Sequence, residues 1–109
     1  MSGVLNLRSD VLVSVVSPIQ NAEGWIADYL RDVSATLADQ YKDYEIVLVD
    51  NASTDGTVEV VEQLQQELKN VQLYCLARSI PHESAFVVGL EQAIGDVVVT
   101  LDAAYDPVD

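Results

Sequence analysis

A dense cluster of polar side chains lies at positions 50–57, where the sequence reads Asp-Asn-Ala-Ser-Thr-Asp-Gly-Thr. Its first two residues, Asp50 and Asn51, directly follow an apolar run. Ser53 and Asp55 are residue types that cap the first turn of a helix, because their side-chain oxygens accept hydrogen bonds from backbone N–H groups. For Asp50 and Asn51 two interpretations stay open: a turn whose side chains bond the backbone, or an exposed loop that binds a polar ligand.

Four apolar runs have the length and composition of strands. They cover residues 11–17, 44–50, 71–76 and 96–101, and the first has the pattern of a parallel strand covered on both faces. Apolar residues that recur every three or four positions predict a helix after each of the first three runs, beginning near Asn21, Val58 and His82. Asn21 is a residue type that caps helices.

This order of strands and helices predicts the fold class. Alternation with short connections implies right-handed crossovers and a Rossmann-like, three-layer α/β/α domain with a mainly parallel sheet of about four strands. Ligands of such sheets bind at the carboxyl ends of the strands. Polar clusters follow three of the predicted strands, at 18–23, 50–57 and 102–106. We therefore expect a binding site where these clusters meet.

The length and charge of the chain limit what it can be. Its 109 residues suffice for one compact domain, which we expect to have its core at 10–104 and a tail at 105–109. Half of the residues are apolar, so a core can form despite 18 acidic and only 5 basic side chains, a formal net charge of −13. That charge argues against nucleic acid or an anionic lipid surface as a partner, since phosphates would be repelled.

The sequence pattern predicts neither a membrane span nor a secretory signal. No apolar run approaches the ~20 residues that a membrane-spanning helix needs, and the first residues lack the features of a secretory signal. Cys75, the single cysteine, falls in a predicted strand and is typical of a buried small hydrophobe. We therefore expect a cytoplasmic protein without a membrane span.

Three stretches of the chain resemble one known family. Residues 49–57, Val-Asp-Asn-Ala-Ser-Thr-Asp-Gly-Thr, are similar to the signature Val-Asp-(Asp/Asn)-Gly-Ser-Thr-Asp-Gly-Thr of family 2 glycosyltransferases. Residues 13–21 resemble the opening Val-Ser-Val-Val-Ile-Pro-x-Tyr-Asn of that family. Residues 89–96 resemble its Gly-Leu-x-x-Ala-x-Gly-Asp, which leads into a metal-binding Asp-x-Asp motif. The match extends over nearly the whole chain.

The resemblance implies a glycosyltransferase A fold whose strand ends bind a nucleotide diphosphate sugar. The chain would then be the N-terminal, donor-binding half of an enzyme that transfers a sugar to an acceptor of the cell-envelope or polysaccharide type. Six nucleotide-binding positions follow from the motifs: Pro18 beside the base, Gln20 in place of the usual tyrosine, Asp50 supporting the loop, Asn51 hydrogen-bonded to the base, Arg78 close to the nucleotide, and Asp102 near ribose and metal.

The metal-binding motif departs from the family pattern. Its second aspartate falls at Ala104, which cannot coordinate a cation. A divalent ion such as Mn²⁺ or Mg²⁺ would then depend on Asp102 and Asp106, whose carboxylate oxygens suit hard cations. We expect this weakened site to raise nucleotide affinity only slightly.

The stretch after the arginine also departs from the pattern, because the family is glycine-rich where this chain has residues 79–83. Glu83 adds negative charge where a diphosphate is expected. We interpret His82 as an ordinary surface histidine, since no carboxylate is paired with it in the sequence. The family's catalytic base follows the metal motif, so we expect this chain alone not to complete a transfer.

Two other α/β classes fit less well. A phosphoacceptor receiver domain needs an acidic pair after its first strand, where this chain has Ser17 and Pro18. A dinucleotide-binding domain needs a Gly-x-Gly-x-x-Gly turn, which is absent there. A degenerate glycosyltransferase-like module for binding or assembly stays open as the alternative, because it would explain Pro81, Glu83 and Ala104 together.

The last predicted strand has the properties of a pairing edge. Residues 97–101 are apolar and mostly β-branched, and they contain neither lysine nor proline, the residues that usually block edge pairing. We therefore expect a homo-oligomer formed through this edge of the sheet.

Overall fold

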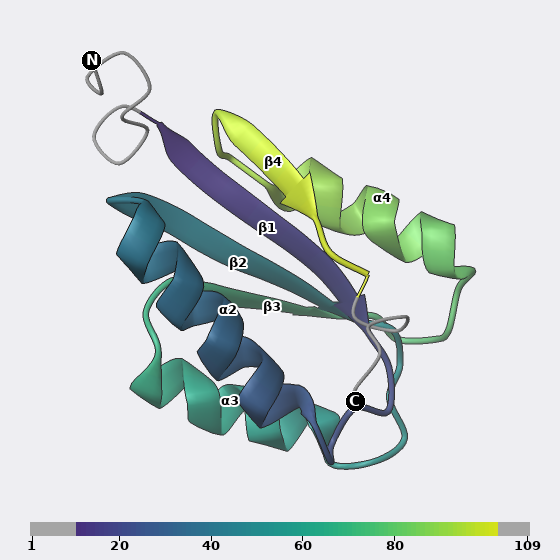
Figure 1. The fold of residues 1–109 in the computed structure, drawn as a ribbon. Coiled ribbons are helices and arrows are strands. Elements are labelled where there is room, and N and C mark those ends of the chain that lie inside the picture. Colours follow the sequence, from purple (N-terminus) through teal and green to yellow (C-terminus); the bar gives the residue numbers. More distant parts are fainter. Residues whose placement is uncertain (1–10, 103–109) are drawn as a thin grey trace, which may run out of the picture.

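The computed structural model describes residues 11–102, which form an α/β fold of four strands and three helices (Figure 1). The predicted alternation of strands and helices is confirmed. The predicted tail at 105–109 lies outside the described residues, as do Ala104 and Asp106. In chain order the elements are β1 (Leu12–Ile19), α2 (Ile26–Gln40), β2 (Asp43–Asp50), α3 (Thr57–Glu67), β3 (Val71–Cys75), α4 (His82–Gln92) and β4 (Val97–Thr100).

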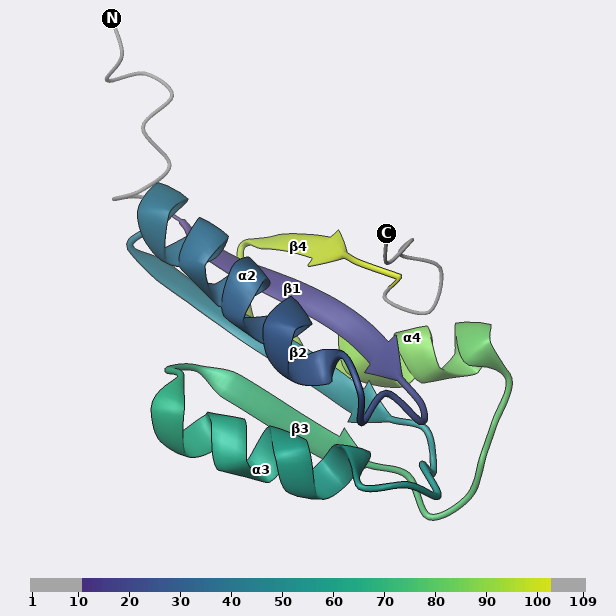
Figure 2. The same cartoon turned by 60° about the horizontal axis from the view of Figure 1, so that its bottom comes forward.

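The four strands form one parallel sheet in the order β3-β2-β1-β4. Strand β1 lies between two neighbours, so that Val15 pairs with Ile46 on one side and with Val99 on the other. Helices α2 and α3 cover one face of the sheet and α4 covers the opposite face (Figure 2). Because all strands run in the same direction, their carboxyl ends lie along one edge, where the three polar clusters were expected to meet.

The two faces of β1 follow the alternation of a strand. Val13 and Val15 belong to the main core together with Leu30 of α2. Val16 points to the other face, where a Cβ atom added to Gly89 of α4 would lie 2.5 Å from Val16 Cγ1. Gly89 therefore allows helix and sheet to approach closely, which explains one glycine of the family-like motif in structural terms.

A buried polar network ties the turn before β4 to the amino ends of β1 and β2. The carboxylate of Glu45, which is 7% exposed, accepts hydrogen bonds from Ser14 Oγ at 2.5 Å and from the N–H of Ile94 at 2.9 Å. The N–H of Gly95 donates to Ser14 Oγ at 2.8 Å. Each polar group of this network has a partner, as buried polar groups require.

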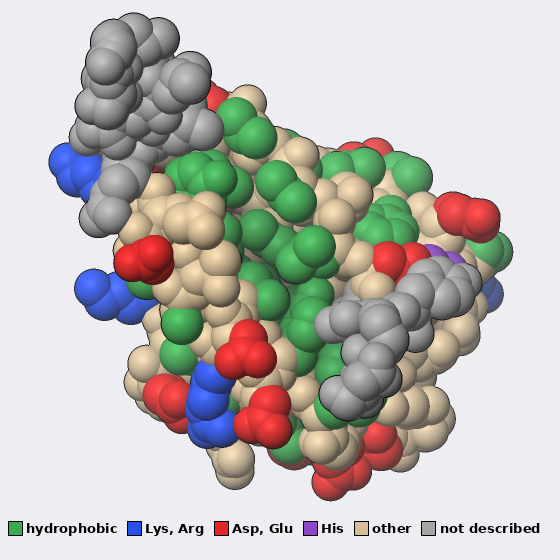
Figure 3. Space-filling view, in the orientation of Figure 1, with side chains coloured by type: hydrophobic (Ala, Val, Ile, Leu, Met, Phe, Trp, Pro, Cys, Tyr) green, Lys and Arg blue, Asp and Glu red, His purple; other side chains and the backbone are tan. Residues whose placement is uncertain are grey.

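Among the strands of residues 11–102, β4 is the exposed edge of the sheet next to β1. Val97, Val98 and Val99 keep 41%, 41% and 40% of their surface exposed, whereas seven of the eight β1 residues are buried. An open apolar groove of about 560 Å³ lies between α2 and β4, lined among others by Val33 and Leu101. Figure 3 shows hydrophobic side chains gathered in this region of the surface. The edge position predicted for this strand is thus observed.

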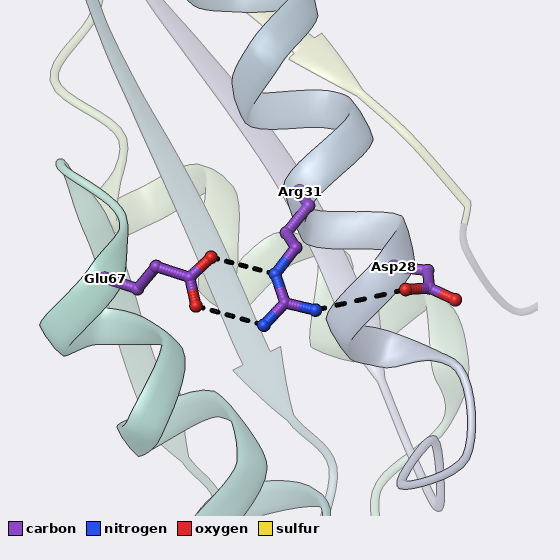
Figure 4. A network of polar contacts seen from close by, with 3 residues as sticks. All are labelled: Asp28, Arg31 and Glu67. Atoms are coloured by element: carbon purple, nitrogen blue, oxygen red, sulfur yellow. Dashed lines mark hydrogen bonds and ion pairs between the residues drawn. The ribbon is translucent and has the colours of Figure 1, made fainter.

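A surface ion pair joins the two helices on the same face. Arg31 of α2 donates to Glu67 of α3 through Nε at 2.8 Å and through Nη2 at 3.0 Å, and its Nη1 lies 4.0 Å from Asp28 (Figure 4). The hydrogen bond from Arg31 lowers the pKa of Glu67 and correspondingly raises the pKa of Arg31. Both side chains are about half exposed, at 49% and 48%, so water screens the pair and its contribution to stability is small.

Within residues 11–102, none of the helices combines the length and the apolar character that crossing a membrane requires.

Candidate functional site

The loop after β2 is held in place by its own aspartate. Asp50 is 2% exposed, and its carboxylate accepts hydrogen bonds from the Ser53 N–H at 3.1 Å and from Ser53 Oγ at 2.5 Å. These contacts fold the chain back sharply, and Ala52 between them has a φ of 57°. This left-handed conformation favours glycine, the residue that the family signature has at this position. The carboxylate of Asp50 therefore shapes the loop.

Asn51 connects two loops at the carboxyl edge of the sheet. Its side-chain Nδ2 donates to the carbonyl of Ile80 at 2.8 Å, and its Oδ1 accepts from the N–H of Ile80 at 2.9 Å. Only 5% of Asn51 is exposed. The expectation of an exposed loop is therefore wrong for this residue, because its amide pairs with the backbone of a segment that lies 29 positions later in the chain.

The polar cluster after β1 pairs with the cluster after β2. Asn21 accepts from the N–H of Thr54 at 2.7 Å, its own N–H donates to Ser53 Oγ at 2.8 Å, and the N–H of Ala22 donates to Thr57 Oγ1 at 2.7 Å. Asn21 has a φ of 51° and does not cap α2, whose cap position is Trp25 without a side-chain hydrogen bond. Its predicted role as a helix cap is thus wrong, since its side chain bonds the neighbouring loop instead.

Asp55 stabilises the start of α3. Its Oδ1 accepts from the N–H of Thr57 at 3.0 Å and from Thr57 Oγ1 at 2.5 Å. The side-chain hydrogen bond from Thr57 is the main reason why the pKa of Asp55 lies below its ordinary value. The ionised carboxylate is therefore the form that the folded protein favours.

This lowered pKa predicts a pH dependence of stability. A carboxyl group whose pKa falls on folding stabilises the protein above its unfolded pKa, about 3.9, and loses that effect as the pH drops through the folded pKa. We expect wild type to resist urea better than Asp55→Asn at neutral pH, and we expect the difference between their midpoints to shrink as the pH falls below about 3.9. A difference that stays constant as the pH falls would contradict the assigned role.

The two loops enclose a small pocket at the carboxyl ends of β1 and β2. It measures about 180 Å³ and brings together Pro18, Gln20 and Asn51, three of the residues predicted from the motifs. The side-chain Nε2 of Gln20 donates to the carbonyl of Asn51 at 2.7 Å and lies 3.3 Å from Ser79 Oγ. The complete lining consists of Pro18, Ile19, Gln20, Trp25, Asn51, Ile80 and His82.

Three of the six predicted nucleotide-binding residues do not line this pocket. Asp50 is one of them, since its carboxylate bonds Ser53 of its own loop. Arg78 is exposed on the loop after β3 and is not part of the pocket lining. Asp102 follows β4 and lines the apolar groove on the α2 side. That groove is the larger cavity, but the small pocket contains the polar loop residues and is therefore the better candidate for recognising a polar ligand.

His82 is the residue whose position sequence analysis misjudged most. Its Nε2 lies 2.9 Å from Oδ1 of Asp102, and the two side chains are 33% and 30% exposed. The ring also meets Phe86 edge-on, with 5.2 Å between ring centroids. His82 is therefore paired with a carboxylate and lines the pocket, contrary to the interpretation as an ordinary surface histidine. No signal in the sequence indicated this, because the contact depends on β4 lying beside β1 in the sheet.

Few side chains in the described part of the chain are placed to coordinate a metal ion. Between residues 11 and 102 no group of three or more His, Cys, Asp or Glu side chains gathers in a metal-binding arrangement. Asp102 nevertheless presents a carboxylate at the expected strand end, with an imidazole nitrogen beside it. Oxygen and nitrogen ligands of this kind fit a divalent transition metal.

Cys75, at the end of β3, is exposed rather than buried as predicted. Partial burial, together with the negative charges of Asp50 and Glu62, raises the pKa of its thiol. The thiol therefore stays protonated at neutral pH, the form that is a poor nucleophile.

Comparison with known proteins identifies the family. The model of Glycosyl transferase family 2 matches residues 14–103. An undecaprenyl-phosphate 4-deoxy-4-formamido-L-arabinose transferase from Pseudomonas fluorescens (strain SBW25) is 37% identical over 92 residues, which are 84% of this chain and 27% of that protein. The chain thus spans about a quarter of the length of the curated relatives that it matches.

Two solved structures have the same fold. TarS from S. aureus (residues 1–349), in complex with UDP-GlcNAc, is 30% identical with a TM-score of 0.67, over 83% of this chain and 26% of TarS. The mannosyltransferase PcManGT from Pyrobaculum calidifontis, in complex with GDP-Man and Mn²⁺, is 30% identical with a TM-score of 0.74, over 84% of this chain and 27% of that protein. With its parallel sheet and its motifs, the chain belongs to glycosyltransferase family 2 and has the glycosyltransferase A fold.

Proposed function

We propose that the chain binds a nucleotide diphosphate sugar, the donor of a glycosyl transfer, in the pocket at the ends of β1 and β2. The observation that carries this proposal is the pocket itself, in which Pro18, Gln20 and Asn51 come together from two strand ends. The bound UDP-GlcNAc of TarS and the bound GDP-Man of PcManGT support the class of donor.

The pocket has surfaces for both the flat and the polar parts of a base. Pro18, Ile19 and Ile80 provide apolar walls, and the exposed amide of Gln20 stands beside them. Because both polar atoms of the Asn51 side chain bond Ile80, whereas the hydrogen bonds of Gln20 to the described residues use its Nε2, we assign recognition of the base to Oε1 of Gln20 and to backbone groups of the loop. Asn51 then acts by positioning that loop.

Asp102 is the proposed residue for ribose and metal. Bound Mn²⁺ or Mg²⁺ would supply positive charge to the departing diphosphate. The amino end of α4, which begins at His82 in the pocket wall, adds a favourable dipole for an anion. We further propose, as the motifs imply, that Arg78 lies close to the nucleotide and that Asp106 helps to hold the metal ion. The Mn²⁺ in PcManGT supports a divalent ion at such a site.

For the acceptor of the sugar, which is the second substrate, we propose a class of molecule. The relatives named undecaprenyl-phosphate 4-deoxy-4-formamido-L-arabinose transferases support an acceptor of the cell-envelope type. A transfer also needs a base at the acceptor hydroxyl, and we assign none to residues 11–102. We therefore propose that this chain supplies donor binding and does not complete the transfer alone.

Calorimetry with UDP and GDP, in the absence of metal, tests the proposed donor site. We expect weak but saturable binding of one of the two nucleotides, and a loss of about threefold to tenfold in affinity for Gln20→Ala, the effect of a missing hydrogen bond of roughly 0.5–1.5 kcal/mol. Gln66→Ala, exposed on α3, is the matched control and should bind like wild type. Absence of binding with both nucleotides would favour the degenerate module for binding or assembly.

We also propose that the chain forms homo-oligomers through β4. Its three exposed valines and the absence of lysine and proline make it an unprotected edge. The net charge of −13 opposes association, so added salt should strengthen it by screening. Light scattering at rising ionic strength should show a growing dimer fraction that Val98→Lys abolishes, and a monomer at high protein and salt concentration would refute the proposal.

A further inference from the structure

The contact between His82 and Asp102 is produced by the topology of the sheet. His82 is the first residue of α4 and Asp102 follows β4, so both stand at the carboxyl edge although they are 20 positions apart. The structure places Nε2 of His82 at 2.9 Å from Oδ1 of Asp102. Each side chain is about one third exposed, so an ion from solvent can reach the pair.

The distance between the two atoms suits a shared metal ion. Two ligands at right angles on a six-coordinate ion with bonds of about 2.1 Å lie about 3 Å apart. The imidazole ring is also held in its orientation by the edge-on contact with Phe86. A fixed ring loses little freedom when it coordinates, which favours binding.

We infer that His82 and Asp102 together form the metal site of this chain, with His82 providing the protein ligand that Ala104 cannot. This inference rests on the proposed donor function, because diphosphate oxygens and water would complete the coordination. His82 lines the nucleotide pocket while Asp102 lines the neighbouring groove, so their contact stands between the two cavities.

A mixed nitrogen and oxygen site has a different metal preference from a pair of carboxylates. Imidazole nitrogen suits transition metals, whereas Mg²⁺ prefers oxygen ligands. The site should therefore select Mn²⁺ strongly over Mg²⁺. A site made of Asp102 and Asp106 would offer oxygen ligands alone, so a strong preference for Mn²⁺ would distinguish the site with His82 from it.

The sequence permits an unambiguous spectroscopic test, because it contains a single histidine. The untagged full chain is titrated with Mn²⁺, alone and with UDP, and the bound ion is examined by electron spin echo envelope modulation. We expect a coupling to a directly bound ¹⁴N, which changes to the ¹⁵N pattern when the chain carries ¹⁵N-histidine. His82→Gln should remove the coupling and weaken Mn²⁺ binding by about tenfold or more, whereas Gln66→Ala should leave both unchanged.

Mg²⁺ competition gives a second readout that needs no variant, and Mg²⁺ should displace Mn²⁺ only in large excess. Bound Mn²⁺ without nitrogen coupling, or no Mn²⁺ binding up to about 1 mM with and without UDP, would overturn the inference. The metal-free nucleotide titration is independent of these results, so failure of the metal site and failure of the donor site are distinguishable.

Discussion

Replacing Asn51 with leucine is expected to destabilise the whole carboxyl edge of the sheet. Leucine has a similar size but cannot bond the N–H and the carbonyl of Ile80, which Asn51 pairs at 2.9 and 2.8 Å. Leaving both groups without a partner costs about 2–4 kcal/mol. Urea denaturation should therefore show a clearly lower midpoint for Asn51→Leu, and nucleotide binding should be lost with the loop.

The control for this prediction is Gln20→Ala, which changes an exposed side chain on the same pocket. It removes one hydrogen bond, from Gln20 to the carbonyl of Asn51, so its midpoint should fall clearly less than that of Asn51→Leu while nucleotide binding still weakens. The comparison separates a residue that positions the loop from one that contacts the ligand. An unchanged midpoint for Asn51→Leu, with unchanged amide shifts at Ile80, would contradict the structural role of Asn51.

Replacing Gly95 with alanine should have the second large effect, because the new methyl group meets the backbone. A Cβ atom at this position would lie 2.8 Å from both the carbonyl oxygen of Leu12 and the backbone nitrogen of Ser14. Backbone atoms of a buried strand cannot move aside as a flexible side chain can. We expect a loss of about 1–3 kcal/mol in the free energy of unfolding, toward the upper end of that range.

Gly24→Ala is the matched control, since a Cβ atom at Gly24 would have no neighbour within 4 Å. It should be neutral or stabilise the protein by up to about 1 kcal/mol through the lower entropy of the unfolded chain. Equal urea midpoints for the two alanine variants would show that the turn before β4 is not packed as described.

The element order was predictable because it depends on short-range patterns. The spacing of Leu30 and Leu37 on one helix stripe, and the apolar run that ends at Asp50, are local features of the sequence. The rule that ligands bind at the carboxyl ends of parallel strands then predicted a site at this edge of the sheet. Pro18, Gln20 and Asn51 indeed line one pocket there.

The pairings within that edge could not be predicted, because they join distant segments. Asn51 bonds Ile80 and His82 bonds Asp102 only because the sheet order brings their loops together. Asparagine is also a residue type that often caps helices, but the side chain of Asn21 bonds the loop after β2 instead. In each case tertiary contacts decided what the side chain bonds.

The glycines of residues 89–96 show that a sequence motif does not by itself identify the residues that bind a ligand. Gly89 and Gly95 lie in a stretch that resembles a glycosyltransferase motif, and both are required by close packing against β1. A sequence pattern alone does not distinguish residues that contact a ligand from residues that are needed for close packing of the fold. Their neighbours in the structure make that distinction.

The most direct test of the central claim is a map of amide chemical shifts, recorded on the ¹⁵N-labelled chain during titration with UDP and GDP in the absence of metal. The claim that the small pocket is the nucleotide site predicts saturable shifts at Gln20, Asn51, Ile80 and His82, with little change at Val33 in the apolar groove. Shifts confined to the groove between α2 and β4, or no shifts at saturating nucleotide, would contradict it.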